Sequence, residues 1–285
     1  SGHYDELEAR EPQARERALF ERLPGFLAQA TKAAPGLARW LAGHDLASVT
    51  SRAALADLPV LRKEELMELQ RAEPPFGGFA DPARLSGNRV FMSPGPIWEP
   101  LGADGLHSAR ALFAAGIRGG DLVHNAFSYH MTPGAWLIDC GARHLGCTVF
   151  PAGTGNTEMQ VEAASALQPS VYCGTPDFLK VMLDKATETG RDLSSFRRGL
   201  VSGGALFPSL RAEYAERGVT VLQCYATAEF GVIAYESIAP DGTIVPGMVV
   251  NEDLIVEIVR PGTGDPVAEG EVGEVVVTSF NPAYP

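Results

Sequence analysis

The sequence predicts an α/β fold: a mostly parallel sheet flanked by helices, with a helical N-terminal region and a small antiparallel β appendage at the C-terminal end. Three patterns lead to this prediction. Short runs of β-branched and aliphatic residues alternate with helical segments between residues 89 and 224. Most of these helical segments begin near a proline and end at a glycine, which are common helix boundaries. Strand–helix–strand units of this length require a parallel sheet that is covered on both faces.

The first part of the chain, from residue 5 to about residue 70, is expected to be helical. One apolar stripe with helical spacing contains Leu19, Leu23, Phe26, Leu27 and Ala30. Pro24 falls inside this stripe, so we expect a kink or a break there. Shorter helical pieces are expected at residues 37–41 and 62–70. Residues 71–82 are dense in Pro and Gly and therefore form a connector.

The sheet is expected to take its strands from six runs, at residues 89–92, 122–127, 147–151, 170–173, 199–201 and 220–224. Three helices with clear end signals lie between them, at residues 132–146, 175–190 and 208–218. Further strands at 232–235, 254–259 and 274–279 are joined by turns and show no helix signal, which predicts an antiparallel arrangement. We therefore divide the chain into a helical region 1–82, an α/β core 83–228 and a β subdomain 229–285.

Composition and charge argue against several classes of function. A formal net charge of −12 disfavours nucleic-acid binding, which requires a basic surface. No apolar run approaches the ~20 residues that span a bilayer, so no membrane segment is expected. The four cysteines are separated and contain no C-x-x-C pair. This spacing is typical of reduced thiols in a cytoplasmic protein.

Residues 221–229, Val-Leu-Gln-Cys-Tyr-Ala-Thr-Ala-Glu, are the stretch around which the chain is organised. Ligands of α/β proteins collect where the chain leaves the carboxyl end of a strand. Tyr225 offers an aromatic face to a nucleotide base, and Glu229 offers a carboxylate to a metal ion on phosphate oxygens. A buried strand end followed by a surface turn explains these residues equally well.

Two other strands are followed by candidate residues. The second strand run ends with Phe127 and is followed by Tyr129 and His130. A histidine at this place can steady a carboxylate or act as acid or base, although a structural histidine fits equally well. Residues 201–205, Val-Ser-Gly-Gly-Ala, allow a flat ring to lie on the backbone, although a tight turn needs the same residues. There is no dinucleotide fingerprint, no Walker loop and no nucleophile elbow.

The Pro- and Gly-rich turn at residues 93–100 is a poor phosphate loop. Three prolines each remove a backbone donor, and Glu99 adds a negative charge. A structural turn is the favoured interpretation when this segment is taken alone. Because a carboxylate near a phosphate would repel it, we expect Glu99 to face solvent or to pair with an arginine.

In this order, the motifs resemble those of the adenylate-forming acyl/aryl-CoA ligases, and most closely the phenylacetate–CoA ligase branch. The resemblance runs from about residue 58 to residue 285, and it is best from 125–129 through 153–158 to Thr175-Pro176. It implies two steps: a carboxylate and Mg-ATP give an acyl-adenylate, and CoA then displaces AMP to give a thioester. The implied partners are a small carboxylic acid, with aromatic acids included, ATP and CoA. Homodimer formation is left open.

The resemblance also implies roles for individual residues. The acid pocket would be lined by Phe127, Tyr129 and His130. ATP or AMP would be held by Ser202, Gly203, Gly204, Ala205, Tyr225, Ala226 and Thr227, with Ser93 and Gly95 in the phosphate loop. Glu229 would hold Mg²⁺ and Thr227 would contact the α-phosphate. His130, Thr227 and Glu229 would take part in catalysis.

The chain departs from the family pattern in three places. The phosphate loop keeps only Ser93, Gly95 and Pro100, and Glu99 stands where the family has lysine. Ala226 replaces a glycine. The family's ribose-binding segment and its mobile C-terminal domain lie outside these 285 residues, so we expect the chain alone to bind nucleotide weakly and to be inactive. No Cys or His follows Glu229, so zinc is not expected.

Two alternative functions therefore stay open. One is a non-catalytic protein that binds a nucleotide or an acyl-adenylate and has a degenerate phosphate loop. The other is an adenylation domain that loads a carrier protein.

Overall fold

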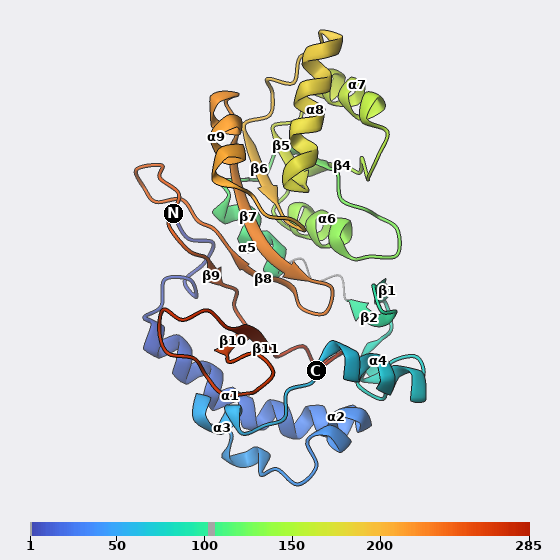
Figure 1. Cartoon of the computed structure of the whole chain (residues 1–285), viewed down its shortest axis with the longest axis vertical. Coiled ribbons are helices and arrows are strands. Elements are labelled where there is room, and N and C mark those ends of the chain that lie inside the picture. Colours follow the sequence, from blue (N-terminus) through green and yellow to red (C-terminus); the bar gives the residue numbers. More distant parts are fainter. Residues whose placement is uncertain (1, 102–105) are drawn as a thin grey trace. The chain divides into compact units, whose positions relative to one another are not determined.

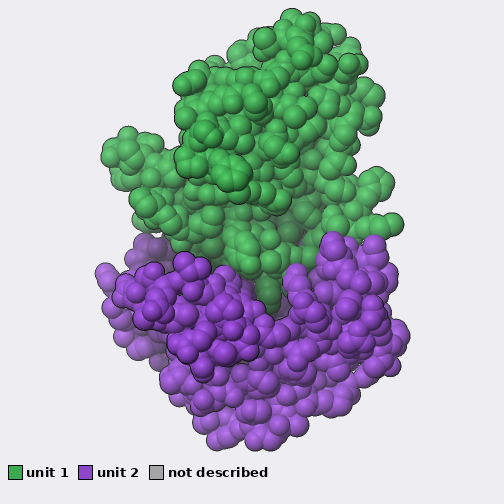
Figure 2. Space-filling model, in the orientation of Figure 1, with its two compact units in different colours: residues 1–5, 103–251 green, residues 6–102, 252–285 purple. Residues whose placement is uncertain are grey.

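The computed structural model describes residues 2–101 and 106–285 (Figure 1). The chain divides into two compact units, shown in separate colours in Figure 2. One unit, which we call the sheet unit, comprises residues 1–5 and 103–251. The other, which we call the helical unit, comprises residues 6–102 and 252–285. The three-part division made from the sequence stays a prediction.

The sheet unit contains a seven-stranded sheet with the order β4-β3-β5-β6-β7-β8-β9 (Figure 1). Its parallel part consists of β4 (Thr148–Phe150), β3 (Leu122–Asn125), β5 (Val171–Gly174), β6 (Arg198–Val201) and β7 (Thr220–Thr227). Two antiparallel strands follow, β8 (Gly231–Tyr235) and β9 (Val249–Val250). The predicted mostly parallel sheet is therefore confirmed. β7 is eight residues long, whereas its neighbour β6 has four.

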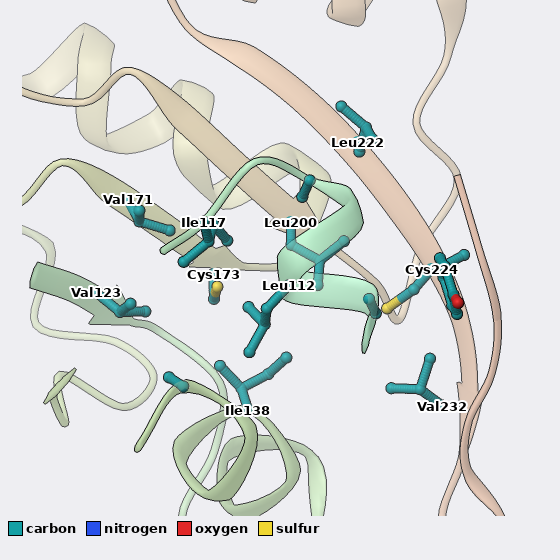
Figure 3. Packing of buried hydrophobic residues seen from close by; sticks show 14 of the residues in the cluster. Leu112, Ile117, Val123, Ile138, Val171, Cys173, Leu200, Leu222, Cys224 and Val232 are labelled. Carbon is teal, nitrogen blue, oxygen red and sulfur yellow. The ribbon is translucent and has the colours of Figure 1, made fainter. Parts of the chain in front are cut away.

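Helices cover both faces of this sheet, as the strand–helix alternation predicted. They are α5 (Leu106–Ala114), α6 (Gly134–His144), α7 (Thr157–Leu167), α8 (Pro176–Thr189) and α9 (Pro208–Glu216). On one face, α5 and α6 enclose a core whose members include Leu112, Ile138, Val171, Cys173, Leu200 and Leu222 (Figure 3). On the other face, α7, α8 and α9 pack against Tyr172, Val201 and Val221. Successive residues of β5, β6 and β7 thus alternate between two cores.

Two helices of the sheet unit were not predicted. The residues that flank α7, Asn156 (φ 49°) and Gln168 (φ 52°), are both in the left-handed conformation. Glycine usually takes this conformation at a helix end, and because neither residue is glycine, the sequence carried no such signal for the ends of α7. In α5, Arg110 is only 1% exposed, so a charged residue lies where an apolar stripe would be expected. Its guanidinium binds the Asp5 carboxylate through both terminal nitrogens, one of them at 2.9 Å. This pairing compensates the cost of burying the charge.

Three strand assignments differ from the sequence-based prediction. β8 was expected in the C-terminal appendage, but it pairs with β7 and extends the main sheet. β1 (Arg89–Ser93) was expected in the parallel sheet, but it pairs antiparallel with β2 (Ile97–Leu101) in the helical unit. β2 itself was not predicted because it contains Pro100. Proline is tolerated in a two-stranded ribbon, where one edge needs no ladder hydrogen bonds.

The helical unit combines residues 6–102 with the C-terminal residues 252–285. It contains α1 (Pro12–Ala33), α2 (Pro35–Trp40), α3 (Arg52–Ala56), α4 (Lys63–Ala72) and the antiparallel pair β10 (Leu254–Val259) and β11 (Glu274–Ser279). α1 continues through Pro24 without a break. Its apolar stripe, with Leu19, Leu23 and Leu27, packs in one core with Ile255 and Phe280. None of the helices among the described residues is long and apolar enough to cross a membrane.

Candidate functional site

The candidate residues of the sheet unit gather at the carboxyl edge of the parallel strands. Asn125 at the end of β3 pairs with Cys173 of β5, and Val201 at the end of β6 pairs with Gly174 of β5 and with Gln223 of β7. The segments that follow these strands therefore leave the sheet at one edge. This edge is the usual ligand site of an open α/β sheet.

Ser202 fixes the loop that follows β6. Its backbone N–H donates to Gly174 O of β5 at 3.2 Å, and its hydroxyl donates to Cys224 O of β7 at 2.8 Å. Gly203 has φ +75°, a backbone conformation that side chains rarely adopt. Gly203, Gly204 and Ala205 are exposed. The loop thus presents bare backbone to solvent while Ser202 anchors it to both neighbouring strands.

Tyr225 lies beside this anchored loop. It follows Cys224, the acceptor of the Ser202 hydroxyl, and a bulge in the β7–β8 pairing falls between Tyr225 and Ala226. The Tyr225 side chain is 42% exposed, which is unusual for a large aromatic residue on a central strand. The Tyr225 ring and the glycine backbone are both exposed, and each can offer a flat ligand a contact surface.

Thr227 and Glu229 lie at the tip of the β7–β8 hairpin (Figure 1). Thr227 is the last residue of β7 and pairs with Gly231, the first residue of β8. The Thr227 hydroxyl accepts a hydrogen bond from the Phe230 N–H at 3.4 Å. A Cβ at Gly231 would lie 3.2 Å from Leu137 Cδ2 of α6, so the tip is close to that helix. Both carboxylate oxygens of Glu229 are shielded from solvent.

Asn125 organises the aromatic segment, and its role was missed in the sequence. Its side chain is fully buried at the end of β3. The amide nitrogen donates to Ala135 O and to the Tyr129 hydroxyl, both at 2.9 Å, and the amide oxygen accepts from the Phe127 N–H at 3.3 Å. Asn125 therefore ties β3, the loop and α6 together. An asparagine that ends an apolar strand just before aromatic residues was the available signal.

Tyr129 is held at both ends. Its hydroxyl donates to Asp139 Oδ2 at 3.2 Å, and its carbonyl oxygen accepts from Trp136 Nε1 at 3.2 Å. Burial and the nearby Asp139 carboxylate raise the pKa of Tyr129 far above its usual value, so the phenol stays neutral. His130 is exposed, and its backbone bonds to Ser128 and Thr132. The two residues thus differ: Tyr129 is fixed, and His130 extends into solvent.

A second buried network supports the loop between β4 and α7. His124 Nε2 lies 2.8 Å from Gln160 Oε1, and Gln160 Nε2 donates to the carbonyl oxygens of Gly153 (2.9 Å) and Gly155 (2.7 Å). Since the Gln160 oxygen can only accept, His124 carries its proton on Nε2. Burial lowers the pKa of His124, so the ring is neutral. The segment 153–158, part of the best resemblance, owes its shape to these two polar residues.

The phosphate-loop candidates belong to the helical unit. Ser93 at the end of β1 is buried, and its hydroxyl donates to Glu99 Oε1 of β2 at 2.9 Å. Gly95 lies exposed in the intervening turn. Of the two alternatives expected for Glu99, exposure to solvent was wrong, since the residue is 1% exposed, and pairing with an arginine stays a prediction. The serine hydroxyl that a phosphate would need is engaged by this carboxylate.

The donor set fits magnesium better than a protein-caged metal. Across residues 2–101 and 106–285, no group of three or more His, Cys, Asp or Glu side chains is placed to hold an ion. Mg²⁺ is commonly bound through one or two carboxylates, with phosphate oxygens and water as its other ligands. The single carboxylate of Glu229, two residues after Thr227 on the same turn, matches that mode.

Comparisons with known proteins converge on one family. Residues 106–283 match the AMP-binding enzyme family. Phenylacetate–coenzyme A ligase of Aromatoleum evansii is 31% identical over 81% of this chain and 54% of its own length. The ligase of the same name from Pseudomonas putida is 30% identical over 80% of this chain and 53% of its own length. The chain thus spans about half the length of these relatives.

Solved structures share the fold. A crystal structure of 2-hydroxyisobutyryl-CoA ligase in complex with 2-HIB-AMP and CoA superposes with a TM-score of 0.91 at 24% identity. It covers 100% of this chain and 70% of that one. A long-chain-fatty-acid-CoA ligase from Archaeoglobus fulgidus has a TM-score of 0.53 and covers 68% of this chain and 42% of that one. The predicted fold class is therefore confirmed by both strand order and overall similarity.

Proposed function

This chain belongs to the AMP-binding enzyme family, and we propose that it activates a carboxylic acid with ATP and passes the acyl group to coenzyme A. In the first step, a carboxylate oxygen attacks the α-phosphorus of ATP, which gives an acyl-adenylate and releases pyrophosphate. In the second, the CoA sulfur attacks the acyl carbon, the thiol proton is lost, and AMP leaves. The relatives named phenylacetate–coenzyme A ligase support this reaction class.

The observation that carries the proposal is the exposed Tyr225 ring, which directly follows the residue to which the loop after β6 is anchored. We assign the adenine of ATP or AMP to this ring and to the backbone of Ser202, Gly203, Gly204 and Ala205. The small side chain of Ala226 leaves space for the base beside the strand. The tyrosine ring supplies a stacking surface, and the glycines allow close approach of the base.

The hairpin tip would receive the phosphate. The Thr227 hydroxyl is assigned to the α-phosphate and the Glu229 carboxylate to Mg²⁺. Magnesium bound there would neutralise charge on the phosphate oxygens. The chain's own contribution is to hold both side chains on one short turn whose position is set by β7 and β8.

The acid would lie against the segment that follows β3. Phe127 and Tyr129 provide aromatic surface, which favours an aromatic acid. The exposed His130 is assigned to the carboxylate, which it would steady as a hydrogen-bond donor or a cation. Phe127 and Ala226 pack against the same core between the sheet and α5 and α6. Because both residues pack against one core, we assign the acid and the nucleotide to the same edge of the sheet.

A cytoplasmic location is part of the proposal. All four cysteines are free thiols: Cys140, Cys147, Cys173 and Cys224. Burial raises the pKa of Cys147 to about 11 and that of Cys224 to about 12, so both stay protonated and unreactive at neutral pH. Free, protonated thiols suit a reducing compartment. Homodimer formation stays a prediction.

A second function, binding of nucleotide or acyl-adenylate without catalysis, is favoured by one observation. Ser93 donates its hydroxyl to the buried Glu99 carboxylate rather than presenting it to a ligand. A loop of this kind offers little to the β- and γ-phosphates of ATP. Under the catalytic proposal, ATP would be held chiefly through adenine, the α-phosphate and magnesium.

The deciding experiment is ATP–pyrophosphate exchange with protein expressed from the complete gene, tested against a panel of carboxylic acids. Exchange that depends on one class of acid supports adenylation, and thioester formation on addition of CoA supports the second step. AMP binding without exchange for any acid would favour the non-catalytic function. Exchange without transfer to CoA would direct the search to a carrier protein.

A further inference from the structure

Tyr129, Asn125, Asp139 and Trp136 form a connected group in the sheet unit, which we call the Tyr129 clamp. The Tyr129 hydroxyl accepts from Asn125 Nδ2 (2.9 Å) and donates to Asp139 Oδ2 (3.2 Å). Trp136 Nε1 donates to the Tyr129 carbonyl oxygen (3.2 Å), and the two rings meet edge to face with centroids 5.2 Å apart. The side chain is therefore fixed at its hydroxyl, its ring and its backbone.

The protons that Tyr129 and Asn125 can donate from their side chains are all used within the protein. A phenol has one proton to donate, and that of Tyr129 goes to Asp139. Asn125 uses both amide protons, on Ala135 O and on the Tyr129 hydroxyl, and its oxygen accepts from Phe127 N. Neither residue has a proton left for a ligand. The raised pKa of Tyr129 keeps this arrangement intact at neutral pH.

We propose that Tyr129 meets the acid with its ring alone, and that Asn125 and Asp139 are positioning residues that set the place of that ring. This inference rests on the proposed function, which assigns the acid to the segment after β3. It adds a statement on specificity: the part of the acid that lies against Tyr129 carries no acceptor that needs a hydrogen bond from the protein, because the phenol proton is already given to Asp139.

Steady-state exchange kinetics of protein from the complete gene test the positioning role. Replacing Asp139 by alanine removes the acceptor for the Tyr129 proton, so the KM for the acid should rise about fivefold, the usual worth of one hydrogen bond. The KM for ATP and kcat should stay unchanged. Asp139→Asn keeps an acceptor oxygen and should restore the wild-type KM for the acid.

Arg143→Ala is the matched control. Its guanidinium lies 3.8 Å from the other Asp139 oxygen and is mostly exposed, so its loss should leave all three constants unchanged. A parallel rise of both KM values in Asp139→Ala, together with a lower melting temperature, would mean a purely structural role and would overturn the inference.

Tyr129→Phe tests the claim about the ring with two acids, phenylacetate and its ring-hydroxylated analogue. If the hydroxyl bonds only to the protein, the KM values for both acids should change by the same factor. A loss confined to the hydroxylated acid would show that the phenol contacts the substrate and would overturn the proposal. If the wild-type protein exchanges with no acid, the proposed function fails and this inference fails with it. An active wild type with unchanged Asp139→Ala kinetics refutes the inference alone.

Discussion

Replacing Ser202 by alanine should weaken adenine-nucleotide binding more than it destabilises the fold. The substitution removes one neutral hydrogen bond, from Ser202 Oγ to Cys224 O at 2.8 Å, and leaves the backbone bond from Ser202 N to Gly174 O intact. Such a bond is worth ~1 kcal/mol, which corresponds to about a fivefold change in a dissociation constant. Because this bond connects the loop to the residue before Tyr225, its loss should let ring and loop separate.

Titration calorimetry with AMP and urea denaturation measure the two effects separately. We expect the Kd for AMP to rise about fivefold and the free energy of unfolding to fall by ~1 kcal/mol or less. Ser202→Thr retains a hydroxyl and should recover most of the affinity, and Ser209→Ala, at an exposed position of α9, should change neither quantity. Unchanged AMP affinity together with reduced stability would show that the loop is structural and does not contact the base.

Four further outcomes are expected. Tyr225→Ala should raise the Kd for AMP by roughly tenfold in calorimetry, since stacking of a base on an aromatic ring is worth ~1–3 kcal/mol. Glu229→Gln should slow single-turnover adenylation by a factor equivalent to ~2–4 kcal/mol while circular dichroism stays unchanged; a wild-type rate would remove Glu229 from the mechanism. Arg110→Ala leaves Asp5 without its bidentate partner and should lower the free energy of unfolding by about 3 kcal/mol in urea denaturation. Burial lowers the pKa of His124 below its ordinary value of about 6.5, so the unfolded chain binds a proton first as the pH falls; stability should decline below about pH 6.5. This decline should be shallower in His124→Asn, and an identical pH profile would contradict the assignment.

The helices and strands that were predicted correctly are those whose terminal residues are typical of helix or strand ends. The bounds of β10 and β11 match the predicted strands, because β-branched residues fill each run and turn residues flank it. α8 begins at Pro176 and ends before Gly190, which has φ +65°, as its terminal residues indicated. α7 lacked such signals at both ends and was missed. The pairing of β8 with β7 depends on a hairpin turn of mixed composition, which no short motif reveals.

The candidate site shows the same division. Tyr225 and Ser202 were identifiable because an aromatic residue and a Ser-Gly-Gly turn are recognisable at the end of a strand. The side chain of Asn125 bonds to partners up to 10 residues away along the chain, and that of Gln160 bonds to partners up to 36 residues away. Both residues are important because they are buried and because of where their partners lie in the fold. A sequence read residue by residue gives no measure of either. Glu99 is the clearest case, since its burial depends on the strand that contains Pro100.

The unequal lengths of β6 and β7 have a consequence for how this site can vary between related proteins. β6 pairs with β7 only from Thr220 to Gln223, so the last four residues of β7 extend past the end of their neighbour. Tyr225 and Thr227 both lie on this overhang. Insertions in the loop after β6 can therefore reshape the surroundings of a ligand without shifting the register of any paired strand. Selection for a new ligand can act on loop length while the sheet, and the stability it provides, is inherited unchanged.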